Sequence, residues 1–169
     1  FLCIPLRFIL AQKAAPYASQ ATLALASWRV ILAANECRVY FALNGSEFDP
    51  ADITSLLGVV PTTTKKKGEK VPGRLPKYSS WQLSTADIKA ETIDVYSLAS
   101  EISNILAAKT HKILEAIKVY DVSPRLQVVL SISTNEEEST PAIGFEVETI
   151  KFLSDIGCFI DIDTYKHES

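Results

Sequence analysis

Two aspartates near the C-terminus are the clearest candidates for chemistry in this chain of 169 residues. Asp161 and Asp163 alternate in an apolar run typical of a strand, so both carboxylates point to one face of it, together with Phe159 and Tyr165. Two carboxylates at this spacing could hold a hard divalent cation and serve a metal-assisted hydrolase. The competing interpretation, which we favour, is a solvent-facing strand whose charges discourage pairing of its edge with another strand.

A cluster of basic residues forms the second candidate. The segment from Pro61 to Lys77 contains three prolines, two glycines and six basic residues, which predicts a long exposed loop. The residues that could bind phosphate or nucleic acid there are Lys65, Lys66, Lys67, Lys70 and Arg74. The formal net charge is −3 and the first 35 residues carry +3, which leaves −6 on the rest. A solvated loop is therefore favoured over a nucleic-acid site.

Histidines, cysteines and glycines supply no recognisable catalytic motif. His111 and His167 stand in no local pattern with serine, cysteine or an acid. Cys3, Cys37 and Cys158 are odd in number and form no close C-x-x-C pair, which argues against a disulfide framework and a zinc site and favours a reducing, cytoplasmic setting. No phosphate-binding loop or dinucleotide fingerprint occurs, and we expect no cofactor.

The elements that must position these residues begin near Cys37. Residues 1–36 contain two apolar clusters, but Pro5 and Arg7 interrupt the first and Arg29 the second, so neither reaches the ~20 apolar residues of a membrane span. We expect an N-terminal extension there, unstructured or loosely helical, with a targeting segment or a functional amphipathic helix as alternatives. Residues 37–166 then form one α+β domain.

Five strands and three helical segments are predicted in this domain. The strands are 37–45, 80–85, 125–133, its hairpin partner 142–147, and 158–165, and the helices are 50–57, 95–117 with a break near Thr110 and His111, and 149–156. Asp49 is the expected N-cap and Pro50 the first residue of the first helix, which Gly58 ends, as Gly157 ends the last. Trp81 and Leu83 are expected to face the core.

The order β-α-loop-β-α-β-β-α-β predicts a single mixed or antiparallel sheet covered by helices. The buried stripe of the long helical segment is expected to comprise Leu98, Ile102, Ile105, Ile113 and Ile117. The second half of the domain, α-β-β-α-β, is compatible with a ferredoxin-like arrangement in part.

Several short stretches of the domain together indicate a known family. They are Phe48-Asp49-Pro50, Leu57-Gly58 followed by Pro61-Thr62, Lys67-Gly68-Glu69, Ser80-Trp81, and the terminal Asp161-x-Asp163-x-Tyr165. With these stretches, the chain from about 37 to 165 resembles a bacterial family of domains of unknown function, DUF4279. It departs from the family at Thr63 to Lys66, where an aromatic residue or arginine is frequent. The resemblance implies an α+β domain without an assigned activity.

Three classes of function follow, in order of preference. The first is a non-enzymatic protein-binding module that binds a basic partner. An immunity protein against a toxin is its most specific form. The second is a phosphate or nucleic-acid binder that uses the basic loop 65–77. The third is the hydrolase built on Asp161 and Asp163.

Overall fold

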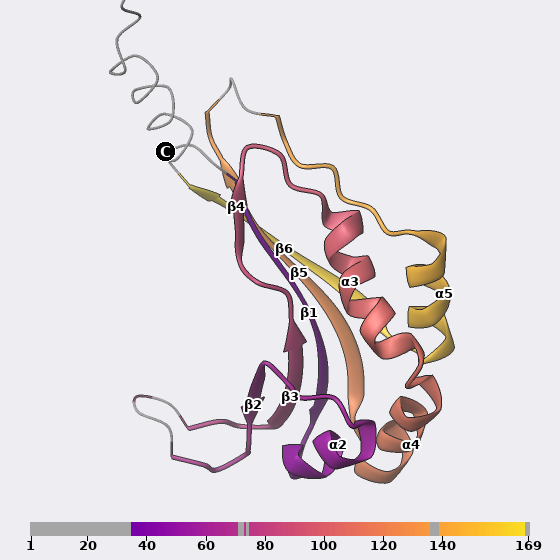
Figure 1. Ribbon diagram of the computed structural model, residues 1–169. Helices are drawn as coiled ribbons and strands as arrows, with labels where there is room; N and C mark the ends of the chain where they lie inside the picture. The colour runs from indigo at the N-terminus through magenta and orange to yellow at the C-terminus, as the bar shows by residue number, and fades with distance from the viewer. Residues whose placement is uncertain (1–34, 71–72, 74, 136–138, 168–169) are drawn as a thin grey trace, which may run out of the picture.

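A single mixed sheet forms the centre of the protein in a computed structural model that describes residues 35–70, 73, 75–135 and 139–167 (Figure 1). Its strands are β1 (Asn35–Gly45), β2 (Thr63–Lys65), β3 (Ser79–Ser84), β4 (Ile88–Ala90), β5 (Ser123–Ser133) and β6 (Phe159–His167). They lie in the order β2-β3-β1-β5-β6, and β4 pairs with the start of β1. Only β5 and β6 are parallel to each other; the other pairs are antiparallel. The predicted fold class is confirmed.

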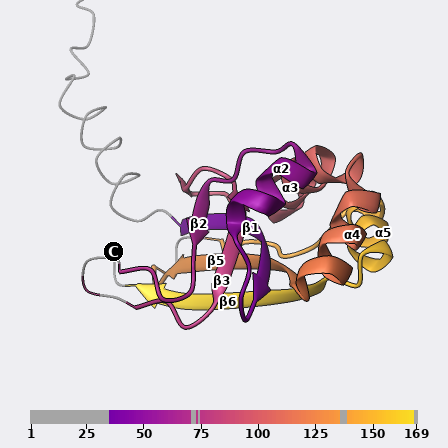
Figure 2. The ribbon, with the colours of Figure 1, turned by 90° about the horizontal axis from the view of Figure 1, so that it is seen from below.

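All four described helices lie on one side of this sheet (Figures 1 and 2). They are α2 (Pro50–Leu57), α3 (Val95–Ala107), α4 (Thr110–Tyr120) and α5 (Val147–Asp155). The helix α3 packs on the central strand β1, α5 packs beside α3, and α2 contacts α4 and β3. Within the described residues, no helix has the length and apolarity needed to cross a bilayer.

The hydrophobic core fills the space between the sheet and the helices. Strand side chains alternate between the two faces of a sheet, so the apolar residues at every second position of the long strands meet the helices. The strand residues of this core are Val39, Phe41, Leu43, Trp81, Leu83, Leu126, Val128 and Leu130, and the helices contribute residues such as Ile53, Leu98, Ile102, Leu106, Ile113 and Phe152.

Local signals define α2. The Asp49 carboxylate accepts a hydrogen bond from the Ala51 N–H (2.9 Å), and Pro50 at the first helical position has its φ angle fixed by its ring. The helix ends where Gly58 adopts a left-handed conformation (φ 64°), which costs a glycine little because it has no Cβ. The turn that follows α5 likewise contains a left-handed glycine, Gly157 (φ 62°).

The predicted hairpin between 125–133 and 142–147 is wrong. Both neighbouring positions of β5 are taken, one by β1 and the other by β6, so no edge of β5 remains for the 142–147 segment. That segment forms only an isolated bridge between Ala142 and Asp94, and it runs beside the helices into α5, which begins at Val147. Its alternating pattern therefore had no strand to pair with.

Two smaller expectations also need correction, and one is confirmed. Residues 63–65, expected to be loop, form β2 because their backbone pairs with β3, and the three-residue β4 was not predicted. In the helical stripe, Ile105 is 44% exposed and the buried residue is its neighbour Leu106. The predicted break near Thr110 is confirmed, because α3 ends at Ala107 and α4 begins at Thr110, so the long helical segment is two helices.

Candidate interaction surface

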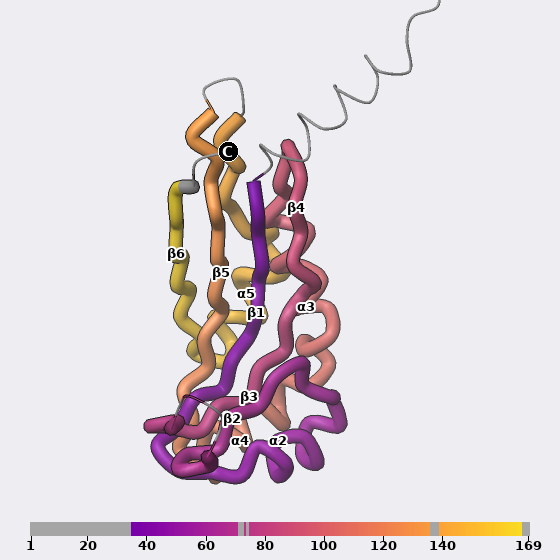
Figure 3. Tube along the Cα trace, turned by 90° about the vertical axis from the view of Figure 1, so that its left-hand side faces the viewer, coloured from indigo at the N-terminus to yellow at the C-terminus, as the bar shows by residue number. Residues whose placement is uncertain are grey.

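The side of the sheet opposite the helices is exposed along much of its length, and we call it the open face. In Figure 3 it faces the viewer: β6, β5, β1 and β3 lie in front of the helices, and β2 with the segment that follows it crosses the lower end. Its upper and central side chains are Glu36, Arg38 and Tyr40 of β1, Arg125, Gln127, Val129 and Ser131 of β5, and Phe159, Asp161, Asp163 and Tyr165 of β6.

Register places these side chains in rows across the strands. Gln127 lies between Tyr40 and Asp161, and the next row places Val129 between Arg38 and Asp163. Neighbouring side chains on one face of a sheet are close enough to interact, so each row brings together groups far apart in sequence.

Ion pairs compensate most of the charges on this side. The Arg38 guanidinium lies 3.7 Å from the Asp87 carboxylate and 5.7 Å from the centre of the Tyr40 ring, while the Lys89 ammonium lies 2.9 Å from the Glu36 carboxylate. Glu36, Arg38 and Asp87 border a hollow of about 240 Å³ between β1 and β5. All of them are substantially exposed, so each pair contributes little to stability.

The two aspartates of β6 lie on the open face but differ in their surroundings. Asp161 Oδ2 is 3.6 Å from Arg125 Nη1, so a cation already neutralises this carboxylate. Asp163 forms no ion pair with any described residue. No group of three or more histidine, cysteine, aspartate or glutamate side chains close enough to hold a metal ion occurs in the part of the chain that the structure describes.

Three buried polar atoms have no hydrogen-bond partner among the described residues: Ser84 Oγ, Arg125 Nε and Gln127 Nε2. All three side chains belong to the open side of the sheet, because their neighbours along the strands face the core. Gln127 is only 2% exposed, since the side chains around it cover it. A buried polar group normally has a hydrogen-bond partner, so these three atoms are available to a bound water molecule or a ligand.

The described basic residues of the 65–77 segment do not all belong to one positive patch. Lys66 Nζ lies 2.6 Å from Asp49 Oδ2, and Lys67 Nζ lies 3.7 Å from Glu47 Oε2, so two of the lysines meet acids outside the segment. Lys70 is exposed, and Arg74 lies outside the described residues. Lys65 and Lys77 line a separate hollow of about 280 Å³ beside the ring of Tyr78.

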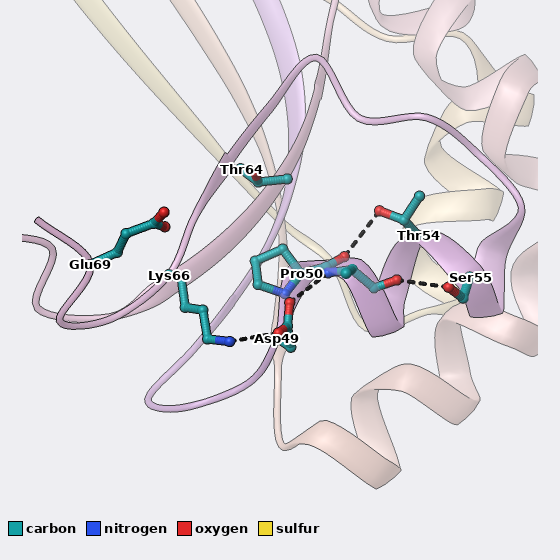
Figure 4. A pocket seen from close by; sticks show the side chains of 8 residues that line it. Asp49, Pro50, Thr54, Ser55, Thr64, Lys66 and Glu69 are labelled. Atoms are coloured by element: carbon teal, nitrogen blue, oxygen red, sulfur yellow. Dashed lines mark hydrogen bonds and ion pairs between the residues drawn. The ribbon is translucent and has the colours of Figure 1, made fainter. Parts of the chain in front are cut away.

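The Asp49–Lys66 pair stands at the N-terminus of α2 (Figure 4). A hollow of about 510 Å³ opens there, and Thr64 and Glu69 also line it. The hydrogen bond from Lys66, aided by the Ala51 N–H, lowers the pKa of Asp49, and the same hydrogen bond raises the pKa of Lys66. Asp49 is thus both the N-cap of α2 and the residue that holds the segment after β2. The positive charge of Lys66 is compensated by this carboxylate.

This linkage predicts a pH dependence of stability. Because the folded-state pKa of Asp49 is depressed, its stabilisation is complete above the unfolded value of about 3.9 and is lost as the pH falls through the folded-state pKa. Asp49→Asn keeps a capping oxygen but removes the charge. Its melting temperature should therefore lie below that of the wild type at pH 7, and the two should converge in strong acid. A difference that stayed constant down to pH 2 would contradict this role of the carboxylate.

The two described thiols are unsuited to nucleophilic chemistry. Burial raises the pKa of Cys37 to about 11 and that of Cys158 to about 12. Both therefore remain protonated at neutral pH and act as small apolar groups.

The sequence reasoning missed the open face, although part of its signal was present. Arg38 and Tyr40 alternate with buried residues of β1, and Arg125 and Gln127 do the same in β5. Polar residues at every second position mark the side of a strand that does not meet the helices. Their assembly into one surface depends on the pairing of β1, β5 and β6, which the sequence does not reveal.

Comparison with known families gives one match. The family model described as a domain of unknown function (DUF4279) matches residues 35–167, which is the whole of the described domain. No curated protein and no solved structure matches the chain.

Proposed function

The chain belongs to the DUF4279 family of domains of unknown function, and from its own surface we propose that it is a non-enzymatic protein-binding module. The observation that carries this proposal is the open face, because the four helices cover only the other side of the sheet (Figure 3). Charged, polar and aromatic side chains from three strands meet on it. Such a mixture of aromatic anchors within a polar surround is typical of surfaces that bind other proteins.

The charge of β6 favours a basic partner. Asp161 and Asp163 project from the same side of the strand, flanked by the aromatic rings of Phe159 and Tyr165, which are about half exposed. Opposite charges across an interface raise the rate of association and select the partner. The most specific form of this proposal is an immunity protein that binds a basic toxin.

Phosphate or nucleic-acid binding is the second candidate. The specific observation in its favour is the hollow where Lys65 and Lys77 lie beside Tyr78, since lysines attract phosphate and an aromatic ring can stack on a base. The metal-assisted hydrolase ranks last, because the Arg125 guanidinium competes with any cation at Asp161.

Affinity capture with matched variants tests the first proposal. We expect a cellular partner that the wild type retains and that a double variant, Asp161→Asn with Asp163→Asn, binds roughly fivefold or more weakly, since each cross-strand charge pair contributes about 0.2–1 kcal/mol. The control is Glu101→Gln with Glu115→Gln, which removes the same charge from exposed positions on α3 and α4. The affinity is measured by calorimetry with the purified partner.

The same capture separates the two candidates. Retention that disappears after nuclease treatment would favour the second candidate over the first. If the wild type and both variants retained no protein, or retained it equally well, the open face would not be a protein-binding surface.

A further inference from the structure

The outer edge of β6 is the longest uncovered strand edge in the described structure. The strand has 9 residues and pairs with β5 on one side, while no described strand pairs with its other side. In parallel pairing, every second residue of β6 directs its N–H and C=O groups away from β5. Such a row of backbone groups is a template on which another chain can add a strand. The opposite edge of the sheet ends in β2, which has only 3 residues.

Apolar side chains are exposed on both sides of this edge strand. Phe159 and Tyr165 lie on the open face, while Ile160 and Ile162 alternate with them and are about 40% exposed. Native edge strands are normally short, or protected by proline, charged side chains or a bulge. The strand β6 has no proline and an unbroken register with β5, and from Phe159 to Tyr165 its only charges are Asp161 and Asp163, which repel an acidic strand but attract a basic one. A strand added here would cover apolar surface on both faces of the sheet.

Resting on the proposed protein-binding function, we infer that β6 captures its partner by strand addition, and that the partner supplies an extended segment with lysine or arginine at alternate positions. Residues directly opposite each other in adjacent strands share one face, so the basic side chains would meet Asp161 and Asp163. Asp163 has no compensating cation among the described residues, and Asp161 has one at 3.6 Å. The intervening apolar side chains of the segment would pack against Ile160 and Ile162.

The same aspartates argue against a second copy of this chain as the occupant. Antiparallel pairing of two β6 strands over their full length, with Phe159 opposite the copy's last strand residue, places Asp163 directly opposite Asp163 of the copy. Like charges in that position destabilise the pair. The carboxylates thus repel self-association and attract a basic strand.

A pair of synthetic peptides tests the inference on the full chain. Each peptide has the length of β6 and a fluorescent label; one alternates lysine with valine, and the other alternates glutamate with valine. We expect the lysine peptide to bind in fluorescence anisotropy and the glutamate peptide to bind at least tenfold more weakly. Asp163→Asn should weaken binding of the lysine peptide about two- to fivefold, and Asp163→Lys should make the glutamate peptide the tighter binder. Glu115→Gln on α4 should change neither affinity.

Amide hydrogen exchange locates the bound peptide. Strand addition should slow exchange at alternate residues of β6 by tenfold or more, because these amides gain hydrogen-bond partners. Equal binding of the two peptides, or no binding, would overturn the inference. Binding of the lysine peptide without slower exchange in β6 would overturn strand addition while leaving the protein-binding proposal standing. If the protein formed a stable dimer with protected β6 amides in the absence of peptide, a second copy would occupy this edge. That result would also overturn the inference.

Discussion

Trp81→Ala should lower the free energy of unfolding by about 3–5 kcal/mol, the range observed when a large aromatic side chain is removed from a packed core. Trp81 is 0% exposed and is paired across the sheet with Leu43 of β1. Its indole N–H donates a hydrogen bond to Thr54 Oγ1 (3.1 Å), which ties β3 to α2. Truncation would therefore leave a cavity and release the contact between the sheet and α2. Urea unfolding followed by circular dichroism measures the loss.

Trp81→Phe separates the two contributions. It keeps an aromatic ring but removes the donor, and the Thr54 hydroxyl still has the Pro50 carbonyl as its own acceptor (3.0 Å). We expect a smaller cost, about 1–2 kcal/mol, from one lost hydrogen bond and a smaller ring. If Trp81→Ala cost less than about 1 kcal/mol, Trp81 would not anchor the core, and an aromatic kept for binding would be the better explanation.

The second large effect is a contrast between two adjacent aromatic residues of β1. Phe41 is 0% exposed and faces the helices beside Leu83 and Leu126, whereas Tyr40 points to the open face. Phe41→Ala should cost about 3–5 kcal/mol because it leaves a cavity. Tyr40→Ala should cost only about 1 kcal/mol, since a side chain on an uncovered face can be removed without opening the core.

Chemical unfolding of the two variants under the same conditions tests the one-sided architecture directly. Equal losses would mean that the open face is packed as tightly as the helix side, and the binding surface proposed for it would have to be abandoned. The Tyr40 variant should also retain the unfolding cooperativity of the wild type, measured as the slope of the transition.

The helix α2 was predictable because its signals lie within ten residues. Asp49 caps it, Pro50 opens it and Gly58 ends it, and none of these roles requires a distant contact. The exposed side of α3 was harder to assign, because Ile105 and Leu106 are both apolar and adjacent. Which of them is buried depends on where α3 meets β1 and α5, and that is decided by tertiary packing.

The candidate site shows the same division. Alternation alone places Asp161 and Asp163 on one face of β6, and the register confirms it. The partner of Asp161 could not be predicted, because Arg125 belongs to a strand that is separated from β6 by a helix and pairs with it in parallel. The pattern at 142–147 was misleading for a related reason, since a strand requires a partner as well as a pattern.

The order of strands in the sheet also has a consequence for synthesis on the ribosome. Of the described strands, the central strand β1 is synthesised first, but its longest partner is β5. Glu36, for example, can pair only after Ser131 has been synthesised. Until β5 is translated, β1 has only β3 and β4 beside it, and β6 can close the edge of β5 only later. Such distant pairings fold slowly, on the order of milliseconds to seconds, and leave unpaired strand edges exposed meanwhile. Until residue 133 has been synthesised, one edge of β1 in the nascent chain therefore remains unpaired.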